Sequence, residues 1–169
     1  IIPGFDRAEE KAVKAIQKHS IKIDETQYNS QIDEAYMLLG KARYFDRRFF
    51  PALEAFNFLL ESGANPSIYL EGKIWREKTN IRLKNTELAI ENLSVLAQSL
   101  SKKNKFYPLV NATLADAYIQ LKQLDSASLY IHRAAIQEPK RKNKARYLFI
   151  SGQLLLSLIH ISEPTRRRG

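Results

Sequence analysis

The chain has no cysteine, and this absence removes several kinds of chemistry at once. Disulfide bonds, thiolate metal ligands and cysteine nucleophiles are all excluded. Glycine and proline are also scarce, with six of each among 169 residues, which is too few for a β protein rich in turns. His19, His132 and His160 are isolated, with no carboxylate or second histidine at metal-ligand spacing. We therefore expect neither a metal nor a cofactor.

Motifs that carry catalysis are missing too. There is no glycine-rich phosphate loop and no Gly-x-Ser-x-Gly nucleophile elbow. The pairs Glu9-Glu10 and Asp33-Glu34 are adjacent in sequence, so on a helix their carboxylates point in different directions and form no acid/base dyad. The apolar stretch 147–161 has about fifteen residues, whereas a bilayer span needs about 20. These observations predict a chain that is not an enzyme and does not span a membrane.

What the sequence does have is a repeat. Two series of positions recur with steps of 37 or 38 residues, and small residues dominate both of them. The first series is Gly40, Glu77, Ala115 and Gly152, and the second is Ala52, Ala89 and Ala127. This period is typical of stacked helix pairs, in which a small residue lets two backbones approach. Glu77 then indicates either a local irregularity or a carboxylate that points out at the end of a groove.

Apolar periodicity and helix start and stop signals predict eight helical segments. Asp6, Ser30, Thr86 and Asp125 are the expected N-caps, and Pro51 is tolerated because it falls in a first turn. The segments are 6–20, 30–44, 49–61, 67–83, 86–100, 107–122, 125–137 and one that begins near 141. They divide the chain into a partial preceding repeat with a linker (1–29), three repeats (30–66, 67–106 and 107–140) and the first helix of a truncated repeat (141–155).

The final residues stand apart from the repeats. Residues 156–166 read like the in-frame translation of a transposon-type sequencing adapter over eleven consecutive codons. We therefore interpret 156–169 as a non-native tail on a fragment of a longer protein. The alternative is a natural tail whose arginines bind a membrane or nucleic acid. Without the tail the chain is still basic, but its lysines and arginines are scattered apart from those in 140–144, so nucleic-acid binding is not expected.

Two stretches carry a resemblance to a known family. Their matching positions are Tyr36, Leu39, Gly40, Ala52 and Phe56 in one stretch, and Leu114, Ala115, Tyr118, Ala127, Ala134 and Pro139 in the other. Over 30–155 the chain resembles the tetratricopeptide repeat family, although its repeats exceed the usual length of about 34 residues. The resemblance implies an all-α fold, a right-handed α-solenoid of antiparallel helix pairs.

Three segments resemble a narrower group. Residues 31–45, 49–56 and 73–83 are similar to the tetratricopeptide lipoproteins of Bacteroidetes that are associated with gliding motility and type IX secretion. That resemblance implies a scaffold in the periplasm or at the outer membrane, with any lipid anchor upstream of Ile1. A cytoplasmic location stays open, because the segment that would decide the location is not among these residues.

In this family the first helix of each pair lines a concave groove that binds protein segments. The positions that map to the groove here are Glu34, Met37, Lys41, Tyr44, Glu71, Ile74, Lys78, Ile81, Leu109, Ala112, Asp116 and Ile119. Their mix of aliphatic and charged side chains suits an extended or helical protein segment. The carboxylate clamp of chaperone-binding members is not reproduced, since Met37 and Lys41 occupy two of its places. We assign eight aromatic residues to the core between helices rather than to base stacking: Tyr36, Tyr44, Phe45, Phe49, Phe50, Phe56, Phe58 and Trp75.

Two classes of function stay open at this point. The first is a non-catalytic scaffold for protein–protein interaction in the cell envelope. The second is the repeat region of a multidomain enzyme or regulator whose catalytic part lies outside these residues.

The assignment of the tail makes a prediction about stability. Deletion of 157–169 should change the free energy of unfolding by no more than about 0.5 kcal/mol, because these residues should add little to the repeat packing. Chemical denaturation of the full and shortened chains measures the difference. A larger loss, or genomic reads that span the same eleven-residue string, would contradict the assignment.

Overall fold

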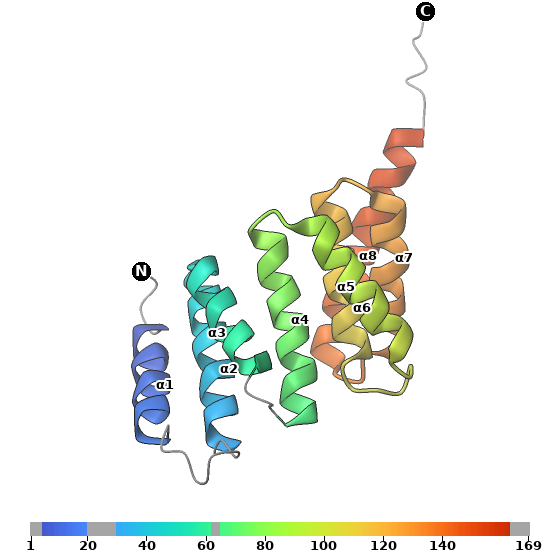
Figure 1. Ribbon diagram of the computed structural model, residues 1–169. Helices are drawn as coiled ribbons and strands as arrows, with labels where there is room; N and C mark the ends of the chain where they lie inside the picture. Colours follow the sequence, from blue (N-terminus) through green and yellow to red (C-terminus); the bar gives the residue numbers. More distant parts are fainter. Residues whose placement is uncertain (1–4, 20–29, 62–64, 163–169) are drawn as a thin grey trace, which may run out of the picture. The chain divides into compact units, whose positions relative to one another are not determined.

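The computed structural model describes residues 5–19, 30–61 and 65–162, and all of its regular structure is helical (Figure 1). The all-α prediction is confirmed, and the first seven helices begin and end within two residues of their predicted bounds. The helices are α1 (Phe5–His19), α2 (Ser30–Phe45), α3 (Phe49–Glu61), α4 (Pro66–Arg82), α5 (Thr86–Ser99), α6 (Tyr107–Gln120), α7 (Leu124–Gln137) and α8 (Arg141–Ser162). The last helix continues past 155 to Ser162, seven residues into the segment interpreted as a tail.

The helices form two compact units, residues 1–85 and 86–169. In the first unit α1 packs on α2, α2 on α3 and α3 on α4, and α2 also contacts α4. In the second unit α5 packs on α6, α6 on α7 and α7 on α8. Consecutive helices within each unit run antiparallel (Figure 1). The predicted repeat 67–106 is divided between the units, because α4 belongs to the first and α5 to the second.

The core of the first unit forms where α2 crosses α3. A Cβ atom added to Gly40 would lie 2.7 Å from Cζ of Phe56, so only glycine lets the ring occupy this place. Phe56 is fully buried and belongs to a cluster with Met37, Ala52, Leu59 and Trp75. The predicted contact between Gly40, Ala52 and Phe56 is therefore present.

The helix α1 is attached to this unit by apolar contacts and by one acidic residue. Ala12 packs against Leu39 and Ala55. Glu9 accepts hydrogen bonds from Arg48 and from Nε of Arg43, the second at 3.0 Å. These bonds, that from Arg48 above all, hold the pKa of the Glu9 carboxyl below its ordinary value, against the opposing effect of burial.

Glu77 contradicts one of the two alternatives that the sequence left open, the carboxylate that points out at the end of a groove. Its side chain is buried, with 1 % of the residue exposed, and α4 is continuous around it. The carboxylate accepts hydrogen bonds from Nε of Arg76 at 2.8 Å and from Nδ2 of Asn80 at 2.9 Å. A buried carboxylate is tolerated when charge and hydrogen-bond partners accompany it, and both come here from the same helix. The expectation of an outward carboxylate was therefore wrong, whereas the alternative of a locally irregular repeat stays a prediction.

Three helices end in the same left-handed turn. Arg47, Lys84 and Lys122 have φ values of 62°, 70° and 59°. In each case the next residue donates its N–H to the carbonyl five residues earlier: Arg48 to Arg43 at 2.9 Å, Asn85 to Asn80 at 2.9 Å and Gln123 to Tyr118 at 2.9 Å. This is the Schellman arrangement, which satisfies the last carbonyls of a helix. The turns are spaced by 37 and 38 residues, the period of the small residues.

The turns also explain why some predicted N-caps were wrong. Gln123, directly after the left-handed Lys122, is the N-cap of α7 and makes no side-chain cap bond, so Asp125 lies inside the first turn instead. Asp6 likewise lies in the first turn of α1. Thr86 is the first residue of α5 and is buried. The side chain of Ser30 lies outside the described residues. A cap that the prediction missed is Asn65, whose side chain accepts from the Ser67 N–H at 3.0 Å.

The addition of one methyl group at Gly40 tests whether α2 and α3 pack as closely as the structure shows. Gly40→Ala should lower the free energy of unfolding by about 1–3 kcal/mol, because the buried Phe56 ring must shift to make room. The matched control is Gly152→Ala on α8, where an added Cβ meets no atom within 4 Å and helix propensity alone should raise stability slightly. Thermal and urea unfolding measure both. Equal stability of the two variants would show that the register of α2 on α3 is different.

Candidate functional site

Four of the predicted groove residues come together on α2 and α4. Lys41 and Tyr44 lie on α2, Glu71 and Lys78 lie on α4, and Trp75 stands between them. Nζ of Lys41 is 2.6 Å from Oε1 of Glu71, which joins the two helices. Nζ of Lys78 is 4.1 Å from the centroid of the Trp75 ring, and Nζ of Lys41 is 5.3 Å from it. We call these five residues the Trp75 cluster.

Aromatic packing fixes the position of this cluster. The rings of Tyr44 and Phe45 both meet the Trp75 ring edge to face, at centroid distances of 5.3 and 5.6 Å. The hydroxyl of Tyr44 accepts a hydrogen bond from Nε of Arg82 at 3.2 Å. The ring of Phe49, at the start of α3, also packs against Tyr44, with 5.5 Å between the ring centroids. The helices α2, α3 and α4 therefore all contribute to holding Tyr44 and Trp75 in place.

The electrostatics of the cluster are unusual for a core. Two ammonium groups lie over one indole, whose face is the negative end of its quadrupole. The Lys41–Glu71 pair is about one third exposed, so solvent screens it and its net contribution to stability is small, about 0–1 kcal/mol. Trp75 itself is only 9 % exposed, and its Nε1 donor has no hydrogen-bond partner among the described residues. An interior tryptophan normally pairs this donor, so the cluster retains an unused hydrogen-bonding group.

Other predicted groove residues lie in the interior instead. Met37 belongs to the Phe56 cluster, and Ile74 and Ile81 are almost fully buried, so these three side chains pack in the core and form no part of an open surface. The family resemblance had assigned these three residues to the groove, but in this chain their side chains face neighbouring helices. Glu34 is exposed on α2 and has no described contact with the cluster.

The groove positions of the third repeat are in the second unit. Leu109, Ala112, Asp116 and Ile119 are half-buried on α6. Ala112 and Ile119 pack against the cluster of Ala115, Ala127, Ile131 and Leu154. Tyr118 and Tyr147 pack there too, and burial raises the pKa of both phenols, so both stay neutral near pH 7. These residues belong to the second unit, whereas the Trp75 cluster belongs to the first.

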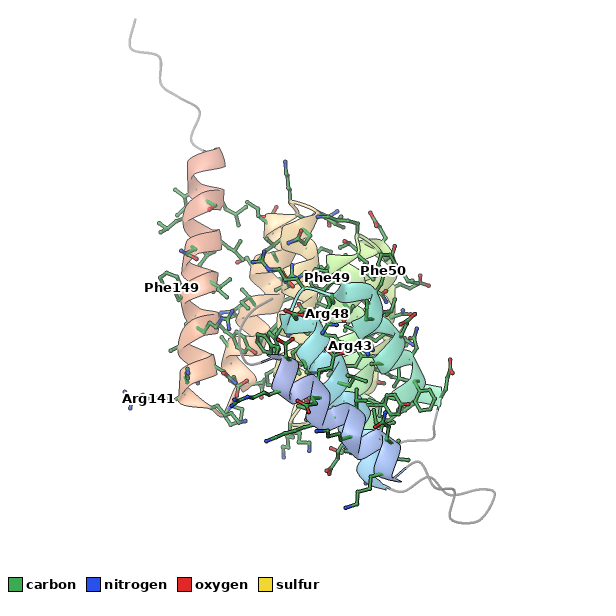
Figure 2. The ribbon with its side chains drawn as sticks, turned by 90° about the vertical axis from the view of Figure 1, so that its left-hand side faces the viewer. Arg43, Arg48, Phe49, Phe50, Arg141 and Phe149 are labelled. Carbon is green, nitrogen blue, oxygen red and sulfur yellow. The ribbon has the colours of Figure 1, made fainter. Side chains whose placement is uncertain are left out.

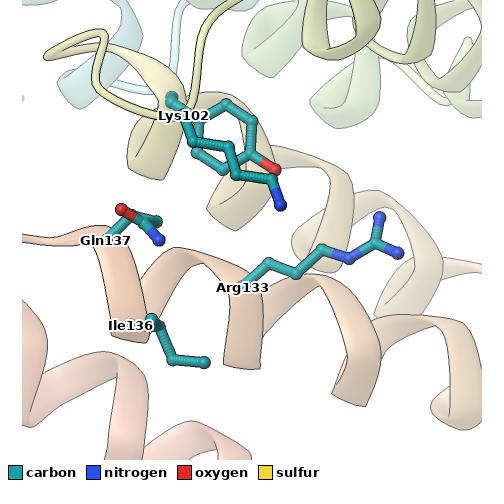
Figure 3. A pocket seen from close by; sticks show the side chains of 5 residues that line it. Lys102, Arg133, Ile136 and Gln137 are labelled. Atoms are coloured by element: carbon teal, nitrogen blue, oxygen red, sulfur yellow. The ribbon is translucent and has the colours of Figure 1, made fainter.

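Sequence reasoning missed a hollow in the second unit (Figure 3). It has a volume of about 350 Å³ and is lined by Lys102, Tyr107, Arg133, Ile136 and Gln137. Arg133 also lies 5.3 Å from the ring centroid of Tyr130. No motif marks this place in the sequence, because Lys102 precedes α6 while Arg133, Ile136 and Gln137 lie near the end of α7.

The described part of the chain contains neither a metal-ligand cluster nor a membrane-spanning helix. No three histidine, aspartate or glutamate side chains within it are grouped so that they could hold a metal ion. None of the helices described is both long and apolar enough to cross a bilayer. His132 is exposed on α7, while the side chains of His19 and His160 lie outside the described residues.

Neither a family model nor a curated protein sequence matches the chain.

The cation over the indole makes a measurable prediction. Lys78→Met keeps the aliphatic stem but removes the charge, so the free energy of unfolding should fall by about 0.5–1 kcal/mol. Trp75 is the only tryptophan, and its fluorescence therefore reports unfolding of the first unit directly. Lys11→Met, an equal charge change at an exposed site on α1, is the control and should have a smaller effect. If Lys11→Met lowers the free energy of unfolding as much as Lys78→Met does, the effect comes from net charge and not from the contact with Trp75.

Proposed function

We propose that the chain is a non-catalytic scaffold that binds a segment of another protein through the Trp75 cluster. Its helix pairs would form a right-handed solenoid of the tetratricopeptide type. The recurrence of the left-handed turn at Arg47, Lys84 and Lys122 with the period of the small residues supports this architecture. The contact of α2 with α4 supports it too, because in a solenoid the first helices of successive pairs are neighbours.

The observation that carries the proposal is the composition of the Trp75 cluster. The half-buried ring of Tyr44, held rigidly by three helices, offers contact area at little entropic cost, and aromatic residues are enriched where proteins bind one another. The lysines and the carboxylate beside them offer polar contacts to a peptide backbone or to its charged side chains. The partner we propose is a protein of the cell envelope, in line with the resemblance to lipoproteins of gliding motility and type IX secretion.

A triple substitution tests this proposal. Lys41→Gln, Tyr44→Phe and Lys78→Gln together remove two charges and one hydroxyl while keeping the ring that fills the core. The variant should no longer capture an envelope partner that the unchanged protein captures, and its helicity should be unchanged. Lys11→Gln with Lys18→Gln makes the same change in charge on the exposed face of α1 and should leave capture intact.

The other outcomes of this experiment favour different functions. Association with nucleic acid that weakens with salt and survives the triple substitution would favour nucleic-acid binding through the scattered cations. Capture by both variants alike would place the binding surface elsewhere. An enzymatic domain joined to these repeats in the complete gene would favour the alternative, the repeat region of a multidomain enzyme or regulator.

A further inference from the structure

The hollow in the second unit carries charge of one sign. Its volume is about 350 Å³, and the described residues that line it include Lys102 and Arg133 but no aspartate or glutamate. Figure 3 shows these two side chains on opposite walls, with Lys102 on the segment before α6 and Arg133 on α7. Neither side chain forms an ion pair within the described part of the chain. Two cations that no carboxylate neutralises therefore line the same small space.

Arg133 is held in place by a stack of aromatic rings. Its guanidinium carbon lies 5.3 Å from the centroid of the Tyr130 ring. That ring stacks on Tyr118, with 5.3 Å between the ring centroids and 9° between the ring planes, and both tyrosines pack against the apolar core of this unit. A guanidinium that lies over a ring can still offer its N–H groups to an oxyanion. Because the side chain is already held, binding an anion costs it less conformational entropy.

Two neutral hydrogen-bond donors complete the lining. Tyr107 is only 9 % exposed, yet its hydroxyl stays accessible and has no hydrogen-bond partner among the described residues. The backbone of Tyr107 is fixed, because its N–H donates to the Asn104 carbonyl at 3.0 Å and its carbonyl accepts from Nδ2 of Asn111 at 2.8 Å. The side-chain amide of Gln137 likewise has no partner in the described part of the chain. The hollow thus offers an ammonium, a guanidinium, a hydroxyl and an amide.

The surroundings of the hollow are also basic. Residues 86–162 contain ten lysines and arginines but five aspartates and glutamates. The acidic residue that follows α7 is Glu138, whose Oε1 accepts from the Lys140 N–H at 2.9 Å. Arg141, at the start of α8, points away from α7 and takes no part in the lining (Figure 2). The start of α6 and the end of α7 carry partial charges of opposite sign, so the side chains decide the potential, which attracts anions.

A phosphate monoester matches this lining better than a carboxylate does. It carries about 1.5 to 2 negative charges at pH 7 and has three strong acceptor oxygens, whereas a carboxylate has one charge and two oxygens. Ile136, which is 56 % exposed, adds an apolar wall for the group that is attached to the phosphate. The volume lies near the lower end of the range of about 300–1,000 Å³ that is typical of small-molecule sites. The ligand that fits is therefore small.

We propose that this hollow binds a small soluble phosphate monoester whose remaining part is apolar. Arg133 and Lys102 balance the two charges of the phosphate, and Tyr107 and Gln137 donate hydrogen bonds to its oxygens. Ile136 packs against the apolar part. All of these residues belong to the second unit, so the site does not rest on the Trp75 cluster. Its failure and that of the proposed function are therefore separate.

The test is a calorimetric titration of the full chain with phenyl phosphate, in a buffer of low salt without phosphate. We expect saturable binding at one site that weakens at least about tenfold in Arg133→Gln and in Lys102→Gln, because each removes a charged hydrogen-bond donor. Lys103→Gln makes the same change in charge at the next exposed residue, outside the lining, and should weaken binding by no more than about twofold. Tyr107→Phe keeps the buried ring and should weaken binding about threefold. Circular dichroism should show unchanged helicity in all four variants.

A second ligand tests the choice of phosphate. Benzoate joins a similar ring to a carboxylate and should bind at least about fivefold more weakly than phenyl phosphate, because it has one charge fewer. Equal affinity for the two would overturn the assignment of a phosphate site.

Three further results would overturn the proposal. The first is that phenyl phosphate shows no saturable binding in the millimolar range. The second is that Lys103→Gln weakens binding as much as Lys102→Gln does, because the attraction would then come from diffuse charge and not from the hollow. The third is that the protein sediments with vesicles that contain phosphatidic acid, loses this binding in Arg133→Gln and does not bind phenyl phosphate. That result would assign the hollow to a lipid headgroup instead of a soluble ligand.

Discussion

The close approach of α2 and α3 at Gly40 is the constraint on which the first unit depends. Because the Phe56 ring occupies the place of a side chain, α3 comes near enough for Met37, Ala52 and Leu59 to close around the ring. Trp75 of α4 joins the same cluster, because its ring stacks on Phe56 with 6.2 Å between the ring centroids. The position of the candidate site is thus a consequence of packing, and its polar groups lie on a scaffold that the small residue makes possible.

The turns between helices extend this constraint along the chain. A left-handed residue at Arg47, Lys84 and Lys122 ends each helix with the same hydrogen bond, and the next helix starts after one further residue in all three cases. Such a turn leaves little freedom in where the following helix lies. Repetition of one turn with one period makes the helix pairs similar, although few of their side chains are the same.

The sequence predicted these features unevenly, for physical reasons. The Gly40–Phe56 contact was predictable, because it depends on residues at regular spacing within two adjacent helices. The burial of Glu77 was not, because it depends on the charge of Arg76 and on a hydrogen bond from Asn80 within one turn. The left-handed turns were also not predictable, since the residues there are arginine and lysine and not the glycine that signals this conformation. Four residues of the predicted groove come together in the structure: Lys41, Tyr44, Glu71 and Lys78. Met37, Ile74 and Ile81 pack in the interior instead. The direction in which a position points around its helix determines whether it is buried, and family position alone does not predict that direction.

The exposed apolar side chains of α8, among them Phe149, which points away from α7 (Figure 2), have a consequence for the behaviour of the protein in solution. A surface with exposed leucine and phenylalanine favours self-adhesion, and what opposes it is the mutual repulsion of molecules with a net charge of +9. That repulsion weakens when salt shortens the Debye length and vanishes as the pH approaches the isoelectric point near 9.7. The colloidal stability of the chain is therefore electrostatic in origin.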